Sequence, residues 1–512
     1  MRVRNLKLNL TVLLALFALS TSTPAQDKTP PAAEEPPALP KGIEVLARGP
    51  VHEAFASLGG EPTPTRAVPK RPPKPLNELP PTDKPEGHVV WIGGYWAWDD
   101  DGKEYLWVSG LWRTPPPHKQ WIGGYWREQG HQWQWVPGFW TDAVEEGKNS
   151  KEVTYLPMPP QMPNVAPSGQ APNADSFYVP GNWTWNAVAN SYAWRAGYWA
   201  RVQPGYVWMA DHYLWTPNGY LFVPGYWDLA VGQRGVLYAP LLVDPNLMTS
   251  GFAYTPYYAV SDTLLVGALF VQPAFGHYYF GDYYGPMYAR MGYESVFLYG
   301  RRRYDSIVAY ETWAHRSQPN WVSTQINVFN LRSRGVLPVP PRTLIQQNTI
   351  VQRNVTNVTN LTNNITNISN NSTKYNTSVL TPASKLMASK GVNAVPLDAA
   401  MREQTKQQAG SIQQAAAQRV AIERPSSAST PGQAHVASLN LPKTQAGQSG
   451  FAALRSAQSP YGAHPGYGPG SPYPTTPHTP PGQPMRGMPG LPMYRPMSRP
   501  VESPPRRPPP RR

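Results

Sequence analysis

The chain has 512 residues, enough for several domains, but 62 Pro and 42 Gly make up about a fifth of it. Only 15% of the residues are charged, whereas 19 Trp and 29 Tyr are present, so we expect an aromatic-rich folded middle between low-complexity arms. The absence of cysteine excludes disulfides, thiolate metal sites, a cysteine nucleophile and the cysteine of a lipoprotein anchor.

The N-terminus has the features of a secretory signal peptide. A basic start (Arg2, Arg4 and Lys7) precedes an apolar stretch at 8–20, and small residues follow at a plausible cleavage site. This stretch is shorter than the ~20 residues that a membrane-spanning helix needs. We therefore expect residues 1–25 to direct export and to be removed, which leaves no transmembrane span. An N-terminal membrane anchor is the alternative.

After the signal peptide, composition divides the chain up to residue 227 into four parts. Residues 26–86 are Pro-rich and predict an extended linker, within which the apolar spacing of 42–56 predicts a patch that folds locally or docks. Two repeat units follow at 87–140 and 177–227, and a Pro/Asn-rich connector at 141–176 joins them.

A six-residue motif with an aromatic residue near each end recurs in two sets of four. Its copies are WIGGYW at Trp91, WVSGLW at Trp107, WIGGYW at Trp121, WVPGFW at Trp135, YVPGNW at Tyr178, WRAGYW at Trp194, WMADHY at Trp208 and FVPGYW at Phe222. Each set has the spacings 16, 14 and 14, and the sets are offset by 87 residues, since 178 − 91 and 222 − 135 are both 87. The pattern indicates tandem duplication of a four-motif unit.

The fourth position of the motif is nearly always glycine. Glycine adopts positive φ without a Cβ penalty, and Asp, found once at Asp211, tolerates it better than most residues. We therefore expect a kink or bulge with positive φ at the centre of each motif. The glycines concerned are Gly94, Gly110, Gly124, Gly138, Gly181, Gly197 and Gly225.

Turn signals between successive motifs predict short connections, for example Gln129-Gly130 and Asn218-Gly219. Strands at this pitch joined by short turns are typical of an antiparallel meander. The expected fold is therefore mainly β: two tandem four-stranded antiparallel meander units, a Tyr-rich α+β segment, and long disordered Pro-rich arms. One small sheet buries a marginal core, so the two units should pack together or onto the Tyr-rich segment.

The motif resembles that of the YXWGXW (WXXGXW) repeat proteins, found in exported bacterial proteins and lipoproteins. The resemblance covers 91–140 and 178–227 and implies a cell-envelope context without an established activity. This chain departs from the lipoprotein members because it has no lipobox cysteine.

Ten Trp lie in the first unit and seven in the second. They either fill the cores of small sheets or leave one face open as an aromatic platform for sugar rings, peptidoglycan or Pro-rich peptide. We favour the core and expect some rings to remain on the surface as well. The candidate surface residues are Trp91, Trp96, Trp107, Trp121, Trp135, Tyr178, Trp194 and Trp199.

The second half of the chain begins with a Tyr-rich segment at 228–335, in which 306–315 and 320–331 predict two short helices. Its His277, Asp282, Tyr283 and Tyr284 either line a polar aromatic pocket or, as we favour, are packed tyrosines with a loop carboxylate. A polar Asn/Thr tract at 336–375 follows; its triplets at 354–373 fit an oligomerising coiled coil, a β-type fibre or a solvated linker.

The remainder, 376–512, predicts a disordered, low-complexity, basic tail apart from a helix near 397–422. The net charge of +14 includes seven arginines of the tail that face only Glu502. In an exported protein such charge indicates anionic lipid, lipopolysaccharide or wall polymer in preference to nucleic acid, and a solvated tail without a dedicated partner is the alternative.

No catalytic motif is present: the chain lacks a P-loop, a Rossmann fingerprint, G-x-S-x-G and H-E-x-x-H, and its His residues are scattered. Asp99, Asp100 and Asp101 predict a turn, because the bidentate acid of a calcium loop does not follow them. We expect no enzyme activity, cofactor or metal site. The leading hypothesis is an exported structural or adhesive cell-envelope protein in the periplasm, on the outer surface or outside the cell. Its expected partner is a wall polysaccharide, an anionic polymer or another envelope protein. The first alternative is a carbohydrate- or peptidoglycan-binding module that uses exposed Trp and Tyr; the second is an enzyme centred on His277 and Asp282.

Overall fold

Each pair of consecutive motifs forms one antiparallel hairpin whose two strands are interrupted at the glycines. In hairpin 1, β4 pairs with β7 and β5 with β6, and hairpins 2 to 4 repeat this arrangement. The strands of hairpin 1 are β4 (Val90–Ile92), β5 (Tyr95–Asp99), β6 (Glu104–Val108) and β7 (Leu111–Arg113). Those of hairpin 2 are β8 (Lys119–Ile122), β9 (Tyr125–Gln129), β10 (Gln132–Val136) and β11 (Phe139–Asp142). Hairpin 3 comprises β13 (Ser176–Val179), β14 (Asn182–Asn186), β15 (Ser191–Arg195) and β16 (Tyr198–Arg201). Hairpin 4 comprises β17 (Tyr206–Met209), β18 (His212–Thr216), β19 (Gly219–Val223) and β20 (Tyr226–Leu229).

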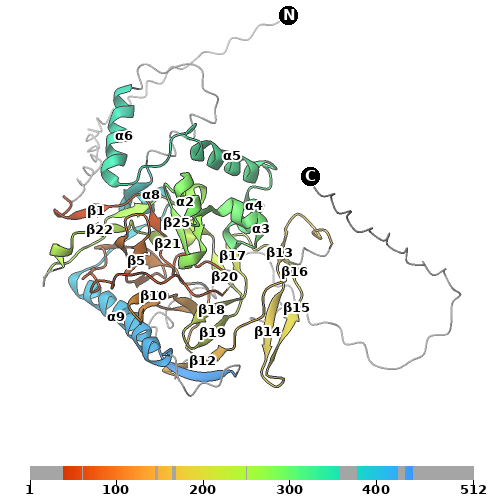
Figure 1. The fold of residues 1–512 in the computed structure, drawn as a ribbon. Helices are drawn as coiled ribbons and strands as arrows, with labels where there is room; N and C mark the ends of the chain where they lie inside the picture. Colours follow the sequence, from red (N-terminus) through yellow and green to blue (C-terminus); the bar gives the residue numbers. More distant parts are fainter. Residues whose placement is uncertain are drawn as a thin grey trace, which may run out of the picture. The chain divides into compact units, whose positions relative to one another are not determined.

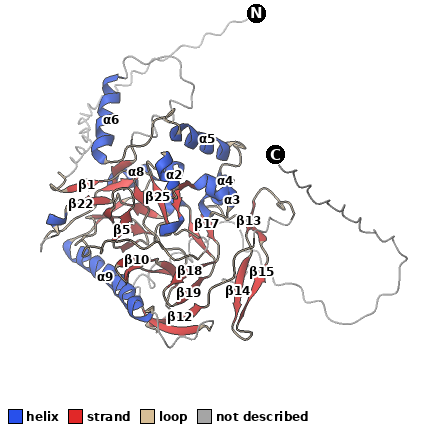
Figure 2. Ribbon diagram, in the orientation of Figure 1, coloured by secondary structure: helices blue, strands red, loops and turns tan. Residues whose placement is uncertain are grey.

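The structure is a computed structural model, which describes residues 38–59, 62–144, 148–163, 169–248, 251–357, 378–424 and 433–441. The signal peptide, nearly all of the Asn/Thr triplets and the arginine-rich tail lie outside these residues. Strands predominate over helices (Figure 2), so the expectation of a mainly β fold is confirmed.

The expected four-stranded meanders are wrong in their connectivity. Within the described residues, β7 of hairpin 1 pairs with β4 and β21 (Gly235–Leu237), whereas β8 of hairpin 2 pairs with β11 alone. Successive hairpins are therefore not joined edge to edge. The physical reason is the kink at the motif glycines, which divides each hairpin into two short ladders, such as β4–β7 and β5–β6, in place of two continuous strands.

The two repeat units share tertiary contacts as well as hairpins. In the first unit the indole N–H of Trp126 donates to the carbonyl of Trp96 at 2.8 Å. At the positions 87 residues on, the Tyr213 hydroxyl donates to the carbonyl of Trp183, also at 2.8 Å. Tyr105 packs edge-on against Trp126, with centroids 5.3 Å apart, and its counterpart Tyr192 packs likewise against Tyr213, at 5.8 Å. Duplication therefore preserved the contact between hairpins.

The N-terminal stretch expected as an extended linker forms part of the core. β1 (Ile43–Val45) pairs with β22 (Leu241–Val243), and β2 (Gly49–Pro50) pairs with β25 (His277–Phe280). Val51, Ala54 and Phe55 are fully buried. The alternative that the patch 42–56 docks is thus confirmed, and the linker prediction is wrong for it, because its apolar side chains complete a core that the hairpins alone leave open.

The Tyr-rich segment is a small α+β assembly, as expected. β24 (Leu269–Gln272) lies between β25 and β26 (Glu294–Ser295). Phe270, Tyr279, Tyr283, Tyr284, Tyr288 and Tyr293 form one buried cluster. The two predicted helices are present as α4 (Ser306–Ala314) and α5 (Trp321–Ser333), after α2 (Pro286–Arg290) and α3 (Val296–Arg302).

The predicted helix of the tail is α9 (Ala399–Ile422), the long blue helix of Figure 1. It contacts β4, β8 and β9, and β29 (His435–Asn440) pairs with β12 (Ser150–Leu156) of the connector. The prediction of a disordered tail is therefore wrong for 379–396 and 433–441, whereas the expected helix near 397–422 is present, and the connector contains a strand. The two tail segments, which contain α9 and β29, fold because their apolar residues are buried against the repeats. Ala415 of α9 and Leu439 of β29 are examples.

Short elements complete the described fold. The helices are α1 (Asp262–Leu265), α6 (Leu344–Asn357) and α8 (Ala383–Ser389). The strands are β3 (Asp83–Pro85), β23 (Tyr258–Val260), β27 (Leu380–Pro382) and β28 (Ala394–Pro396), in the pairs β23–β27 and β3–β28. Among the residues that the structure describes, no helix is both long and apolar enough to cross a bilayer.

Candidate functional site

The two motifs of a hairpin contact each other reciprocally at the kink. A Cβ placed on Gly110 would lie 2.5 Å from Cζ2 of Trp91, and one placed on Gly94 would lie 2.7 Å from Cε2 of Trp107. Each glycine thus occupies the space beside the first ring of the other motif. The corresponding pairs are Gly124–Trp135, Gly138–Trp121, Gly181–Trp194, Gly197–Tyr178 and Gly225–Trp208.

These contacts show that the motif glycines are needed for a reason other than the expected positive φ. The described glycines with positive φ include the hairpin-turn residues Gly130 and Gly219, but none of the seven motif glycines. The prediction of positive φ in the motif is therefore wrong. Glycine is needed because a side chain would overlap an aromatic ring and the backbone carbonyl beside it, as with Trp135 and the Val136 oxygen at Gly124.

Asp211, the one exception to glycine, supports this steric explanation. The first residue of the motif paired with it is Phe222, whose ring is smaller than indole. The Asp211 carboxylate accepts hydrogen bonds from Asn182 Nδ2 at 2.8 Å and from Arg195 Nη2 at 2.8 Å. Asp211 therefore ties hairpin 4 to hairpin 3.

Most of the rings predicted as a surface platform are buried. Trp91, Trp96, Trp107, Trp121 and Trp135, all in the first unit, are at most 7% exposed. For these five the prediction of an aromatic surface is wrong, because other segments of the chain cover both hairpins. The three predicted rings of the second unit, Tyr178, Trp194 and Trp199, are half-buried and lie in hairpin 3.

Hairpin 3 carries a partly exposed aromatic face. Trp183 pairs with Trp194 and Trp185 with Tyr192 across β14 and β15, so the four rings share one face, and all are half-buried. The two rings of each pair pack edge-on, with centroids 5.2 Å and 4.9 Å apart. We call these four residues the hairpin 3 face. The equivalent residues of hairpin 1, the hairpin 1 face, are Trp96, Trp98, Tyr105 and Trp107, and all of them are buried.

A Pro-rich segment lies against each of these two faces. Residues 70–74, the first cover segment, accept hydrogen bonds on two backbone carbonyls: Tyr105 OH donates to that of Lys70 at 2.7 Å, and Trp96 Nε1 to that of Lys74 at 2.8 Å. The side chain of Lys70 also lies 5.8 Å from the centroid of the Trp98 ring. Hydrogen bonds to carbonyls and stacking on aromatic rings are the means by which aromatic grooves hold proline-rich chains.

Residues 157–161, the second cover segment, lie on the hairpin 3 face in the same way. Tyr192 OH donates to the carbonyl of Pro157 at 2.6 Å, and Trp183 Nε1 donates to that of Gln161 at 3.2 Å. Both acceptors and both donors are 87 residues after their counterparts in the first unit. The repeated unit therefore begins upstream of its first motif, at the cover segment.

Two buried carboxylates hold the kinks of the first unit. Glu78 accepts the amides of Gly94 and Gly110, at 3.2 and 2.8 Å, and the indole N–H of Trp107 at 3.1 Å. Burial raises the pKa of Glu78 to about 7. Glu53 does the same in hairpin 2, where it accepts from the amide of Gly138 at 3.0 Å and from Trp135 Nε1 at 2.8 Å.

Glu53 also adjoins His277 and a cavity. Nδ1 of His277 donates to the Phe275 carbonyl at 2.6 Å, and its Nε2 lies 3.0 Å from Tyr95 OH and 3.4 Å from Glu53. The cavity, of about 350 Å³, is lined by Glu53, Thr65, Trp215, Tyr299 and Arg302 among others. Because both Glu53 oxygens have donors within the chain, the fold itself uses this carboxylate.

The structure does not bring His277 and Asp282 together. Asp282 pairs with Arg342, Nε to Oδ2, at 2.8 Å, whereas His277 contacts Tyr95 and Glu53. Tyr283 and Tyr284 belong to the buried tyrosine cluster. The hypothesis of a joint His277–Asp282 site is therefore wrong. As expected, Asp99 forms a turn, with its side chain accepting the amide of Gly102 at 2.9 Å.

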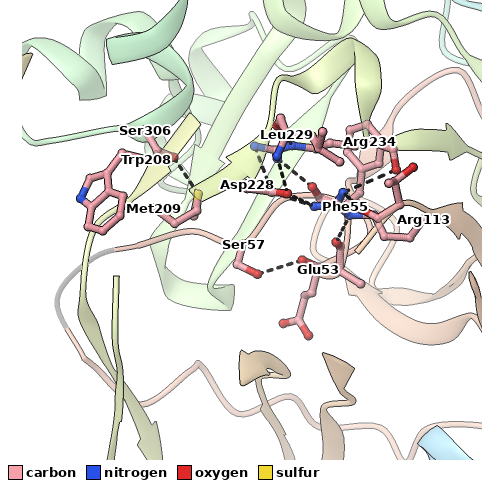
Figure 3. Close-up of polar contacts among 12 residues, drawn as sticks. Glu53, Phe55, Ser57, Arg113, Trp208, Met209, Asp228, Leu229, Arg234 and Ser306 are labelled. Atoms are coloured by element: carbon pink, nitrogen blue, oxygen red, sulfur yellow. Dashed lines mark hydrogen bonds and ion pairs between the residues drawn. The ribbon is translucent and has the colours of Figure 1, made fainter. Parts of the chain in front are cut away.

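A buried ion cluster joins the two repeat units (Figure 3). Asp228 of β20 lies between Arg113 of β7 and Arg234, and all three are at most 2% exposed. Arg113 Nη2 donates to both carboxylate oxygens at 2.5 and 2.7 Å, and Nη2 of Arg234 lies 3.2 Å from Oδ2. The guanidinium groups also donate to the Ala54 and Phe55 carbonyls, at 2.7 and 2.8 Å. The cluster thus holds the N-terminal segment between the two units.

Sequence reasoning missed the cover segments and the buried carboxylates. The cover segments had a detectable signal: Pro72-Pro73 and Pro159-Pro160 are also offset by 87 residues, so extending the comparison upstream would have revealed them. Glu53 and Glu78 had none, because a single acid in a Pro-rich stretch gives no pattern that marks it as buried.

Comparison with known families identifies the hairpins. The family described as WXXGXW repeat (2 copies) matches residues 89–113, 121–141, 177–200 and 204–227, which confirms the expected resemblance. Each matched stretch coincides with one two-motif hairpin. No curated protein and no solved structure matches the chain.

Proposed function

We propose that the protein is a non-enzymatic, exported structural or adhesive component of the bacterial cell envelope, built on its WXXGXW hairpins. The observation that carries the proposal is that the motif residues serve the fold: each motif glycine holds a ring of the partner motif, and indole N–H groups donate to the chain's own carbonyls and carboxylates. Residues used in this way build a rigid scaffold. The hairpin 3 face is the aromatic surface that such a scaffold offers to a partner.

Export is tested by expression of the full chain in a Gram-negative host, followed by fractionation and mass spectrometry. The signal-peptide features at the N-terminus predict a product that starts at Gln26 in the periplasmic or envelope fraction, and a cytosolic product when residues 1–25 are deleted. A full-length chain that stays in the cytosol with its first 25 residues intact would refute the export part of the proposal.

The adhesive role is tested by co-sedimentation of the purified chain with outer-membrane vesicles and with isolated peptidoglycan. An adhesive component sediments with one of the two at physiological ionic strength. If the protein stays in the supernatant with vesicles and with peptidoglycan, the adhesive role is refuted. The structural role then requires that the protein co-purify with an envelope assembly.

The second candidate function is a carbohydrate- or peptidoglycan-binding module, favoured by the half-buried rings of Trp185 and Trp194 on the hairpin 3 face. Sugar rings stack on such aromatic surfaces. Binding to peptidoglycan that falls at least tenfold in Trp185→Ala, but not in Thr184→Val on the opposite face of β14, would support this function. Equal binding by the wild type and both variants would remove it.

A further inference from the structure

The two cover segments share their backbone contacts and a proline pair but not their other side chains. Both place Pro-Pro between two accepting carbonyls, as Lys70 and Lys74 in one and Pro157 and Gln161 in the other. The first segment is strongly basic and the second is uncharged. Recognition therefore depends on the carbonyl positions and the proline pair and does not require charge.

The chemistry of this contact is that of a polyproline II ligand. Proline fixes φ near −65° and keeps the preceding residue extended, so a Pro-Pro segment favours the polyproline II helix and leaves its carbonyls free. Grooves lined with Trp and Tyr bind such segments, and little conformational entropy is lost because the ligand is already extended. Each face supplies an indole N–H and a phenol O–H for this purpose.

The two faces differ in how tightly they are closed. In hairpin 1 all four rings are buried, and the chain continues from the cover segment to buried Leu76 and to Glu78, which accepts two kink amides. In hairpin 3 the four rings remain half-buried, Gln161 is exposed and Met158 is 73% exposed. The rings of the hairpin 3 face are therefore more accessible to a partner than those of the hairpin 1 face.

We propose that the hairpin 3 face is an exchangeable binding site for a Pro-Pro-containing segment of a partner polypeptide. The second cover segment is its intramolecular occupant, and the partner segment takes over the hydrogen bonds from Trp183 and Tyr192. The first cover segment, which lies on the equivalent hairpin 1 face, shows that a basic Pro-Pro sequence can occupy a face of this kind. This inference goes beyond the proposed envelope role and does not depend on it.

The test uses the full chain and a fluorescein-labelled peptide with the sequence of residues 67–76, AVPKRPPKPL, whose binding is followed by fluorescence anisotropy. A second peptide, with both central prolines replaced by alanine, is the ligand control. Tyr192→Phe removes one donor and keeps the ring, and a double Pro159→Ala, Pro160→Ala variant weakens the intramolecular competitor. Thr184→Val, on the other face of β14, is the protein control.

We expect the wild type to bind the Pro-Pro peptide more tightly than the alanine peptide. In the double Pro→Ala background, where the chain's own segment competes less for the same hydroxyl, loss of one hydrogen bond in Tyr192→Phe should weaken peptide binding about three- to tenfold. The double Pro→Ala variant should bind more tightly than the wild type, because its own segment competes less, and Thr184→Val should bind as the wild type does. Circular dichroism confirms that each variant is folded. If the double variant does not fold, the preference of the wild type for the Pro-Pro peptide over the alanine peptide decides.

Three results would overturn the proposal. They are the absence of peptide binding by the wild type and the folded variants, equal affinity for the two peptides, and unchanged affinity when Tyr192→Phe is added to the double Pro→Ala variant. Dimerisation of the chain by exchange of the second cover segment, seen by analytical ultracentrifugation in place of peptide binding, would make a second copy the occupant and overturn it as well.

Discussion

Gly124 lies so close to Trp135 that a Cβ on this glycine would be 2.5 Å from Cζ2 of the indole. The same Cβ would be 2.6 Å from the Val136 carbonyl oxygen, so the strand cannot relax by moving the ring alone. Gly123, its neighbour in the sequence, would place a Cβ 3.5 Å from Ala416, which is ordinary van der Waals contact. Two adjacent glycines of one motif therefore tolerate a methyl group very differently.

We expect Gly124→Ala to destabilise the protein by about 1–3 kcal/mol or more through overpacking, and Gly123→Ala to change stability by less than about 0.5 kcal/mol. Urea unfolding followed by Trp fluorescence measures both. Gly124→Asn separates the steric explanation from a conformational one, since Asn tolerates positive φ but is larger than Ala. A stable Gly124→Asn variant would contradict the steric explanation.

Periodicity identified the repeats but not their pairing. The spacings of 16, 14 and 14 and the 87-residue offset are local properties of the sequence, and they located the four hairpins that the motifs form. The pairing of motifs two by two depends on the contact between each glycine and the facing ring, which one strand considered alone does not reveal. The glycine positions were thus predicted for the wrong physical reason.

Contacts between distant segments explain what else could not be predicted. Arg113 and Asp228 are separated by 115 residues, and Tyr125 and Glu423 by 298. Glu53, Glu78 and Arg419 are buried ions in stretches whose Pro or Gln/Ala composition is typical of flexible chain. Composition measures average tendency, whereas one buried ion pair can fix such a segment on the core.

Glu78 should make stability depend on pH. Its carboxyl group has a pKa of about 7 in the folded protein, raised by burial from 4.5. The folded state therefore binds the proton more tightly than the unfolded state, so this contribution to stability is present below about pH 4.5 and is lost as the pH rises through 7. The full effect corresponds to about 3 kcal/mol.

Glu78→Gln removes the titrating group and keeps the shape of the side chain. Unfolding free energies measured in urea between pH 5 and pH 8 (roughly the window in which the group titrates) should fall less steeply in the variant than in the wild type. Equal slopes in the two proteins would show that Glu78 does not titrate in this range. Glu128→Gln, at an exposed site, is the matched control.

Arg419 should fix α9 to hairpin 2. Its side chain is fully buried, and its Nη1 donates to the carbonyls of Gly123 and Pro137, each at 2.9 Å, while Nε pairs with Glu423 at 2.7 Å. We expect Arg419→Ala to cost about 3–5 kcal/mol, because it leaves a buried carboxylate without its ion partner. Gln408→Ala, on an exposed part of the same helix, should cost less than about 1 kcal/mol. Thermal unfolding monitored by circular dichroism compares the two, and similar melting temperatures would show that α9 contributes little.

The last prediction concerns the ion cluster between the two repeat units. Asp228 neutralises one of two buried guanidinium groups, so Asp228→Asn leaves both Arg113 and Arg234 without a counterion in a place that water does not reach. The cost of such a change is about 3–5 kcal/mol, which approaches the whole stability of many domains. Asp142→Asn provides the comparison, because Asp142 pairs with Lys119 while its own side chain is 59% exposed, and an exposed pair contributes at most about 1 kcal/mol. Guanidinium unfolding of the two variants should therefore differ by at least about 2 kcal/mol. If Asp228→Asn were no less stable than Asp142→Asn, the cluster could not be what holds the N-terminal segment between the units, and the buried apolar residues Val51 and Phe55 would have to hold it alone.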